Sequence, residues 1–164
     1  MLNNGIHPTL FFYNPNIYPR EEYEIRKREI VRYAAKLGVE IIDGDYDHDA
    51  WRACIAGHEG DKERGGRCLL CFEMRLRRTA AVAVERGFDT IATTLASSRW
   101  KSLEQIEEAG QKAVSGYEGL TFWAKNWRKE GLQQRRSELL KENGFYNQLY
   151  CGCEFSMANL KINN

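Results

Sequence analysis

Four of the five cysteines in this 164-residue chain lie in two close pairs. Cys68 and Cys71 are separated by two residues, and Cys151 and Cys153 are separated by a single glycine. A thiolate is a soft, anionic ligand, and two thiolates this close in sequence can bind one metal centre. Together the two pairs predict a site of four thiolates, which would suit either zinc or an iron–sulfur cluster.

The cysteines also allow a simpler interpretation, in which the two pairs have unrelated uses. The first pair would then consist of buried core thiols on a helix, and the second would be a surface dithiol that can be oxidised. The fifth cysteine, Cys54, lies alone on a short apolar segment and is predicted to be a core residue.

The composition restricts the class of protein to which the chain can belong. Charged residues make up 29% of the sequence and the net charge is +1, which excludes a polycation or a disordered charged tail. No apolar run is long enough to span a membrane, and the first residues do not form a secretory signal. We therefore expect a cytoplasmic protein. In that reducing compartment, paired cysteines bind metals more often than they form disulfides.

Basic residues accompany the first cysteine pair and two tryptophans. Arg75 and Arg78 follow Cys71 at helical spacing, so they are expected on the same helix face. The segments SRWK (98–101) and NWRK (126–129) place Trp next to Arg and Lys, a combination that suits phosphate contacts and base stacking in RNA binding. The alternative is a solvated helix face with the tryptophan rings in the core. No P-loop or G-x-G-x-x-G motif indicates a bound nucleotide.

Polar residues follow two of the predicted strands. Asp43, Asp45 and Asp47 alternate after one strand, where they can act as turn and N-cap residues, which is the favoured interpretation for Asp47. The other possibility is a metal ligand or a proton donor. Tyr13 and Asn14 follow another strand, and they could contact a substrate or cap the turn.

Short apolar segments alternate with helical segments, which predicts an α/β domain with a parallel sheet covered by helices. In such sheets, sites form beyond the carboxyl ends of the strands, so the segments YNPNI, DGDYD and ASSRWK are expected to converge. The segment from Phe145 onward is predicted to be irregular. The predicted strands cover residues 9–14, 39–43, 89–95 and 120–123, and the predicted helices cover residues 18–38, 50–56, 67–87, 102–116 and 127–144.

Linked motifs along the chain resemble those of a known family. They are LFFYNPNIYPREEYEIRK, DYDHDAW, ERGGRCLLCFEMRLRRTA, TTLASSRWK and YCGCEFS, and they extend from about Thr9 to Met157. In order and spacing they are similar to the iron–sulfur epoxyqueuosine reductases of the QueH type.

The resemblance implies a Rossmann-like fold with helices on both faces of a parallel sheet, in a single domain over residues 1–164. It implies reduction of epoxyqueuosine to queuosine at the wobble position of a tRNA, which consumes two electrons and two protons. The implied partners are the tRNA that carries epoxyqueuosine and an electron donor that the sequence does not identify. The implied cofactor is a [4Fe–4S] cluster, with family cysteines at Cys68, Cys71, Cys151 and Cys153.

The resemblance also assigns expected roles to other residues. Asp45 and Asp47 match the acidic segment of the family, and one of them is a candidate ligand of the metal site, which can include an additional metal ion. Asp45 and Tyr13 are expected to be catalytic and to line the substrate pocket with Asn14. The residues expected to hold phosphates of the anticodon are Arg75, Arg78, Arg99 and Lys101.

The chain departs from the family pattern at its N-terminal end. Family members usually begin with a strand, a C-C-x-P-C motif and a helix, and they use these early cysteines at the metal centre. The sequence MLNNGIHPTLFFYN resembles the end of that helix and the next strand, so the first strand–helix unit is expected to be missing. The alternative function is then a non-catalytic module in which four thiolates hold zinc and the basic segments bind tRNA.

Overall fold

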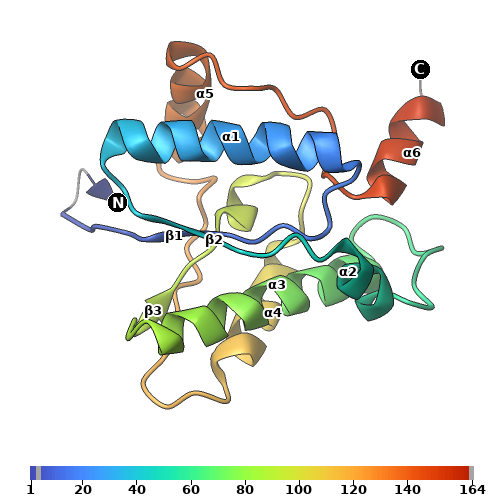
Figure 1. The fold of residues 1–164 in the computed structure, drawn as a ribbon, viewed down its shortest axis with the longest axis horizontal. Coiled ribbons are helices and arrows are strands. Elements are labelled where there is room, and N and C mark those ends of the chain that lie inside the picture. The colour runs from blue at the N-terminus through green and yellow to red at the C-terminus, as the bar shows by residue number, and fades with distance from the viewer. Residues whose placement is uncertain (3–4, 163–164) are drawn as a thin grey trace. The chain divides into compact units, whose positions relative to one another are not determined.

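Helices alternate with short parallel strands in this structure, a computed structural model that describes residues 1–2 and 5–162 (Figure 1). The chain divides into two units, each with its own two-stranded parallel sheet. Unit 1 combines residues 1–50 with the segment from Phe145 onward, and unit 2 is residues 51–144. The α/β class predicted from the sequence is confirmed. No helix in the described part of the chain is both long and apolar enough to cross a membrane.

Unit 1 contains a strand–helix–strand arrangement. Strand β1 (Leu10–Phe12) pairs in parallel with β2 (Ile41–Asp43), and helix α1 (Arg20–Leu37) connects them. The helix packs on the sheet through the rings of Phe12 and Tyr23, whose centroids are 5.4 Å apart. Because both strands are parallel neighbours, the segments YNPNI and DGDYD leave the sheet at the same edge, as predicted. The third predicted segment, ASSRWK, instead follows a strand (Thr90–Ile91) of the other sheet.

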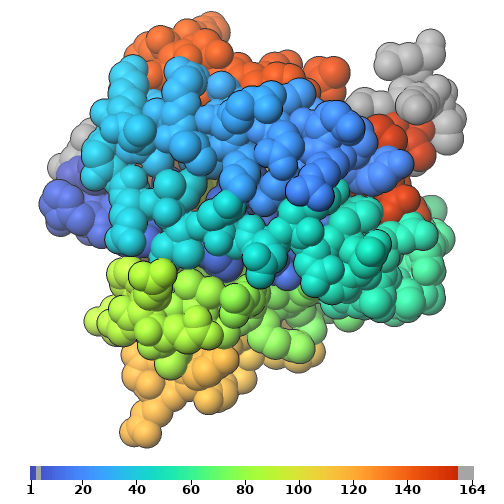
Figure 2. All heavy atoms as spheres, in the orientation of Figure 1, coloured from blue at the N-terminus to red at the C-terminus, as the bar shows by residue number. Residues whose placement is uncertain are grey.

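The ends of α1 follow from local sequence signals. Acidic residues occupy its first turn, and Gly38 ends the helix with a left-handed φ of 63°. Tyr23 and Ala34 of α1 are buried, but Leu37 is 42% exposed because it lies in the last turn. In Figure 2 the atoms of α1, in light blue, lie on the face turned toward the viewer.

The C-terminal segment of unit 1 contains a helix that the sequence analysis missed. Residues Glu154–Ile162 form α6, although the segment from Phe145 was predicted to be irregular throughout. The carbonyl of Cys153 accepts N–H bonds from Ser156 and Met157, both at 3.1 Å, and this nucleates the first turn. A helix of nine residues is too short to show a clear apolar period, which explains the error.

Unit 2 is built around helices α3 (Gly66–Glu85) and α4 (Leu103–Val114). They pack against strands β3 (Thr90–Ile91) and β4 (Thr121–Phe122), which pair in parallel. Residues at helical spacing on α3 and α4 supply most of the apolar core. Core residues of unit 2 include Phe72, Leu76, Ala80, Ile91, Ile106, Ala109, Ala113 and Phe122.

One glycine lets α4 and β4 approach closely. A Cβ atom on Gly110 would lie only 2.3 Å from the ring of Phe122. The ring therefore packs directly against the helix backbone, which a larger residue at position 110 would prevent.

Several predicted boundaries in unit 2 were wrong. The predicted strand 89–95 is a strand only at Thr90–Ile91, and Thr94–Ser97 forms a 3₁₀ turn (η2) in which the Thr93 hydroxyl accepts the Leu95 N–H at 3.2 Å. Helix α5 is Leu132–Glu142 rather than 127–144, because Glu130 and Gly131 have positive φ values of 59° and 75°. Such left-handed residues interrupt a helix.

Helix α2 (His48–Cys54) begins two residues earlier than predicted and crosses the boundary between the units. Its buried residue is Trp51, and Ile55 just beyond it is fully buried. Cys54 is exposed, so its prediction as a core residue was wrong. Its sulfur still lies 3.9 Å from the Leu70 carbonyl, and burial of this sulfur raises the pKa of the Cys54 thiol.

Candidate functional site

The first cysteine pair lies at the start of α3 in unit 2. Cys68 is in the first turn, and the backbone N–H of Arg64 points at its sulfur with an N–Sγ distance of 3.3 Å. Cys71 lies one turn further on and is buried, with 8% of its surface exposed. The N-terminal end of a helix carries partial positive charge. The helix end and the Arg64 amide therefore both favour an anionic sulfur at Cys68.

The glycine-rich loop before α3 is tied to the helix start. The Asp61 carboxylate accepts a bond from the Arg67 N–H at 3.0 Å and contacts the His58 ring at 2.9 Å. The hydrogen bond with His58 is the main reason why the pKa of Asp61 is lowered, and the bond from the Arg67 N–H is the second. The buried guanidinium of Arg67 in turn donates to the Glu59 carbonyl at 2.7 Å. The contacts fix the point at which the helix begins, and hence the place of Cys68.

The second cysteine pair lies in a tightly packed loop of unit 1. Cys151 is exposed, Cys153 is half-buried, and Gly152 between them is buried with a φ of 122°. A Cβ atom on Gly152 would lie 3.0 Å from Arg26 Nη1 and 3.1 Å from Ile17 Cγ1. Both the backbone conformation and the available space therefore require glycine at this position.

A buried arginine of α1 holds this loop. Arg26 is 7% exposed, and its Nε donates to Glu22 at 2.8 Å. Its two terminal nitrogens donate to the Tyr150 carbonyl and the Cys151 carbonyl, both at 3.2 Å, and Nη1 also donates to Gln148 at 3.2 Å. A guanidinium is always charged. It therefore fixes the peptide of Cys151.

Two tyrosines complete the network around Arg26. The Tyr146 hydroxyl donates to Glu22 at 2.8 Å, and this bond is the main reason why the pKa of Tyr146 is raised. The Tyr150 hydroxyl donates to the Tyr18 carbonyl, and its ring lies 5.2 Å from the Arg26 guanidinium. Burial, followed by the nearby Glu22 charge, raises the pKa of Tyr150 to about 12.

The aspartates after β2 have different surroundings. Asp47 accepts the Ala50 N–H at 3.0 Å and so caps α2, as favoured from the sequence. Asp43 forms an ion pair with Lys27 of α1. Asp45 is exposed at the same edge of the sheet. Of the two aspartates that match the family segment, Asp45 is thus the one that does not form a helix cap.

Tyr13 and Asn14 lie directly after β1. The Tyr13 ring is stacked on that of Phe11, with centroids 5.7 Å apart and planes 9° apart. The Asn14 carbonyl accepts the Ile17 N–H at 3.1 Å and closes a turn. Both side chains are half-buried. Their predicted contacts with a substrate stay predictions.

His48 occupies a position in unit 1 that no sequence motif signals. Its Nδ1 lies 2.7 Å from the Pro15 carbonyl, which can only accept, so Nδ1 carries the proton. Its Nε2 lies 3.6 Å from a carboxylate oxygen of Glu154, the residue after Cys153. The ring stacks on those of Tyr18 and Tyr46, at 5.5 Å and 6.0 Å. His48 therefore contacts the segment after β1 through Pro15 and Tyr18, and the residue after Cys153 through Glu154.

The four basic residues predicted to hold phosphates all belong to unit 2. Arg75 and Arg78 are on α3, and Arg78 lies 3.8 Å from Glu85, which partly offsets its charge. Arg99 is exposed, and its guanidinium lies over the Trp100 ring at 4.8 Å. Lys101 is half-buried, with its Nζ 6.0 Å from the ring of Phe72. Their role in binding stays a prediction.

Among the described residues, no group of three or more His, Cys, Asp or Glu side chains is placed to hold a metal ion. Each thiol pair nevertheless supplies two soft ligands. The first pair lies at the start of α3, and the second lies around a peptide that Arg26 holds. Asn16 is buried next to Gly152, and its Oδ1 has no hydrogen-bond partner in the described part of the chain. The donor chemistry of each pair suits an anionic iron–sulfur cluster or zinc.

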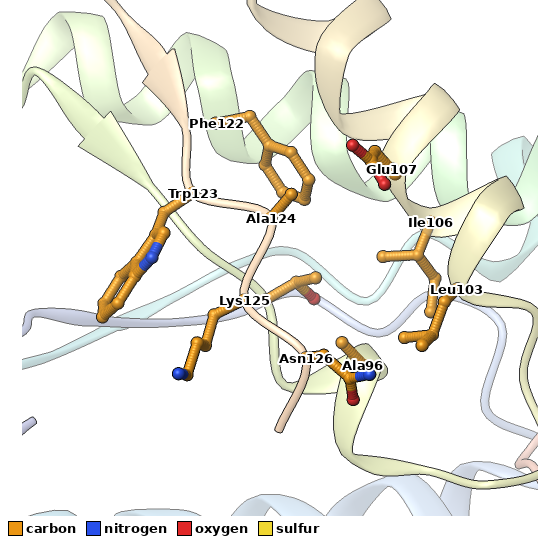
Figure 3. A pocket seen from close by; sticks show the side chains of 10 residues that line it. Ala96, Leu103, Ile106, Glu107, Phe122, Trp123, Ala124, Lys125 and Asn126 are labelled. Carbon is orange, nitrogen blue, oxygen red and sulfur yellow. The ribbon is translucent and has the colours of Figure 1, made fainter. Parts of the chain in front are cut away.

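Unit 2 also contains a small pocket of about 190 Å³ beyond the carboxyl ends of β3 and β4. Figure 3 shows the Phe122 side chain on the side of the pocket where Ile106 and Leu103 of α4 lie. Trp123 and Lys125 lie on the opposite side of the segment that follows β4. None of the site residues predicted from the sequence lines it. Its volume is below the roughly 300 Å³ at which most small-molecule sites begin.

Comparison with known proteins places these features in a family. A model of the family described as "Epoxyqueuosine reductase QueH" matches residues 1–159. The chain belongs to the QueH family of epoxyqueuosine reductases. This confirms the resemblance drawn from the motifs, all of which lie within the matched residues.

Three relatives named epoxyqueuosine reductase QueH illustrate the similarity. The Acinetobacter baylyi protein is 46% identical over 157 residues, which cover 96% of this chain and 72% of the relative. The Haemophilus influenzae protein is 45% identical over 157 residues, which cover 96% of this chain and 64% of the relative. The Thermotoga maritima protein is 38% identical over 150 residues, which cover 90% of this chain and 78% of the relative. The chain therefore spans about two thirds to three quarters of these relatives.

Sequence reasoning found the cysteines but missed the residues that hold them. Arg26 and Glu22 have the spacing of an ordinary surface pair on a helix, and nothing local distinguishes them from exposed neighbours. Arg64 lies in a polar loop, where its positive φ of 68° has no sequence signal. A usable signal was Gly152 between two cysteines, because a glycine there indicates close packing of the loop.

Proposed function

We propose that this chain reduces epoxyqueuosine to queuosine in tRNA; its relatives are named epoxyqueuosine reductase. The family match over residues 1–159 is the observation that carries the proposal. The surroundings of the two cysteine pairs support it, because the Cys68 sulfur lies at a helix N-terminus and a buried guanidinium fixes the Cys151 peptide. The reaction is part of queuosine formation, and a tRNA substrate implies a cytoplasmic location.

The four cysteines of the two pairs would hold the metal centre. When bound, a [4Fe–4S] cluster supplies single electrons at low potential for removal of the epoxide oxygen. Arg26 fixes the peptide of Cys151, and the α3 helix end stabilises Cys68. Asp45 is the better candidate for an additional ligand or a proton donor, because Asp47 caps α2.

The remaining site residues would act on the tRNA. Tyr13 and Asn14 lie at the same sheet edge as Asp45 and would line the pocket for the modified base. The electron donor is not identified. The residues that would contact phosphates of the anticodon are Arg75, Arg78, Arg99 and Lys101.

Metal analysis of an anaerobically purified protein tests the centre. The wild-type chain should contain iron and sulfide and absorb at roughly 400 nm. The substitution Cys71→Ser should abolish the bound iron and sulfide and, with them, the absorption. The matched control is Cys54→Ser, since Cys54 is exposed and its raised thiol pKa disfavours the thiolate. Full iron in the Cys71→Ser variant would refute the ligand assignment, and one zinc without sulfide would favour the non-catalytic module.

An activity assay tests the reaction itself. The metal-loaded protein is incubated with tRNA that carries epoxyqueuosine and with a chemical reductant, and the nucleosides are then analysed by mass spectrometry. Queuosine should appear as epoxyqueuosine disappears, with the loss of one oxygen atom. Absence of conversion in a preparation with full iron and sulfide would overturn the proposal.

A further inference from the structure

A large aromatic side chain is displayed on the surface of unit 2. Trp100 is 66% exposed, whereas Trp51 is 1% exposed. Exposure of a tryptophan leaves a large apolar surface in contact with water. Tryptophan is enriched at interfaces, and an accessible aromatic ring can stack with a base of a single-stranded nucleic acid.

The loop that carries Trp100 is fixed from two sides by arginines. Arg64 donates through Nε to the Trp100 carbonyl at 2.9 Å and through Nη2 to the Arg99 carbonyl at 3.2 Å. Arg128 donates through Nη2 to the Lys101 carbonyl at 2.9 Å. Three consecutive carbonyls are thus held by charged donors. The backbone is ordered before any ligand binds, which lowers the entropic cost of binding.

The charge around the loop is positive. The Arg99 guanidinium lies over the Trp100 ring, with 4.8 Å between Cζ and the ring centroid. Arg64 and Arg128 donate to neighbouring carbonyls of the loop, and burial together with the Arg64 charge lowers the pKa of Arg128. With Lys101, the segment presents cations beside an exposed ring. This combination suits a polyanion with flat, stackable groups better than a neutral protein surface.

The same loop is linked to the first cysteine pair through Arg64. This residue has a φ of 68°, a backbone conformation that is unfavourable for residues other than glycine. Gln105 of α4 holds it by donating to the Arg64 carbonyl at 2.9 Å and the Gly65 carbonyl at 3.3 Å. In this conformation the Arg64 N–H points at Cys68 Sγ while its side chain holds the loop. Strain of this kind persists only where the surroundings enforce it.

We propose that residues 98–101 form a binding surface for an unpaired RNA strand, on which Trp100 stacks with a base. Arg99 and Lys101 contact the adjoining phosphates. Arg64 is a positioning residue that keeps this surface next to the Cys68 thiol. The inference rests on the proposed function, because it names a part of the chain that contacts the tRNA substrate.

Binding of a fluorescent anticodon stem-loop RNA, without the modified base, tests the surface by anisotropy. Trp100→Ala should weaken binding by roughly 5- to 150-fold, the range found for loss of one base–aromatic stack. Trp100→Phe should retain most of the affinity. Trp123→Ala is the matched control, since Trp123 is 38% exposed in the same unit and lies outside residues 98–101. Equal affinity of Trp100→Ala and the wild-type chain would overturn the inference.

The charged part of the surface is tested by salt dependence. Arg99→Ala should reduce the slope of log Kd against log salt by about 1, as expected for one lost phosphate contact. The matched control is Arg86→Ala, at the other end of α3, which should leave the slope unchanged. A fully paired RNA duplex with the same number of nucleotides should bind more weakly than the stem-loop. If the duplex binds equally well, base stacking is refuted.

The role of Arg64 is tested by a variant that keeps its backbone conformation. Arg64→Gly accepts the positive φ and retains the N–H to Cys68, but it loses the grip on the loop carbonyls. RNA affinity should fall several-fold, while the alkylation rate of Cys68 in the metal-depleted protein should stay unchanged. Unaltered RNA affinity would remove the positioning role.

These binding tests do not depend on the reaction, so the two proposals can fail separately. If the wild-type chain converts epoxyqueuosine but Trp100→Ala binds the stem-loop normally, only the surface proposal is overturned. If Trp100→Ala loses affinity but a fully loaded wild-type chain shows no conversion, the RNA surface is supported and the reductase proposal is overturned. If the wild-type chain binds no stem-loop RNA, the surface proposal is overturned.

Discussion

The two cysteine pairs are held in place by different physical means. In unit 2, Cys68 and Cys71 lie on a regular helix above an apolar core, so backbone hydrogen bonds and packing position them. In unit 1, Cys151 and Cys153 lie around a loop peptide that a single buried guanidinium fixes. A helix distributes its positioning over many small interactions, whereas the loop concentrates it in a few strong ones.

This difference determines how strongly a single substitution should destabilise each region. Loss of one residue of an apolar core costs free energy mainly through a cavity or a clash, and neighbours can relax. Loss of one partner of a buried ion pair leaves the other charge without compensation in a poorly solvated place. The loop of unit 1 should therefore be more sensitive to a single substitution than the helix of unit 2.

The largest effect is expected from Arg26→Met. Glu22 would remain as a buried charge, and two carbonyls of the loop would lose their donor, so unfolding of unit 1 should become easier by about 3–5 kcal/mol. Hydrogen exchange of peptides from α1 and from residues 145–158 measures this. Arg28→Met is the matched control, since Arg28 is exposed on the same helix. A loss below about 1 kcal/mol would show that Arg26 is not the residue that holds the loop in place.

A double variant sharpens the same point. Glu22→Leu combined with Arg26→Met removes both charges, so part of the lost stability should return. The iron content should not recover with it, because the Tyr150 and Cys151 carbonyls still lack their donor. Recovery of both quantities would mean that Arg26 serves folding alone.

A smaller effect is expected from Gly110→Ala in unit 2. The added Cβ would meet the Phe122 ring at 2.3 Å, so the ring must move and unfolding should become easier by about 1–3 kcal/mol. Gly116→Ala is the matched control, because a Cβ there meets no atom within 4 Å. Denaturant unfolding measures both variants. Equal stability of the two variants would show that the Phe122 ring can move without a loss of unfolding free energy.

The smallest effect is the alkaline response of unit 1. The pKa of Tyr150 is about 12 in the fold against an ordinary 10.0, so between these values the folded chain keeps a proton that the unfolded chain loses. The free energy of unfolding should therefore fall as pH rises from 10 to 12. Tyr150→Phe should reduce this slope and leave a remainder from Tyr23, Tyr46 and Tyr146, whose pKa values are also raised. Identical slopes in urea unfolding would contradict the assignment.

Much of the secondary structure could be predicted because its signals are local. Helices α1, α3 and α4 have long apolar periods and clear ends, and the structure confirms them. Prediction failed where few residues carried the signal, as in the nine-residue α6 and the two-residue β3. That the four thiols share one metal centre stays a prediction, which metal analysis of the cysteine variants tests.

The sequence by itself determined the candidate chemistry, since thiol spacing and motif order are properties of the chain and need no fold. It also determined the family, which the match over residues 1–159 bears out. Only the tertiary structure decided what holds the thiols. Arg26 and Cys151 are 125 positions apart, and Arg64 and Trp100 are 36 apart. A hydrogen bond depends on distance in space, and no local pattern reports which distant carbonyl a guanidinium will reach.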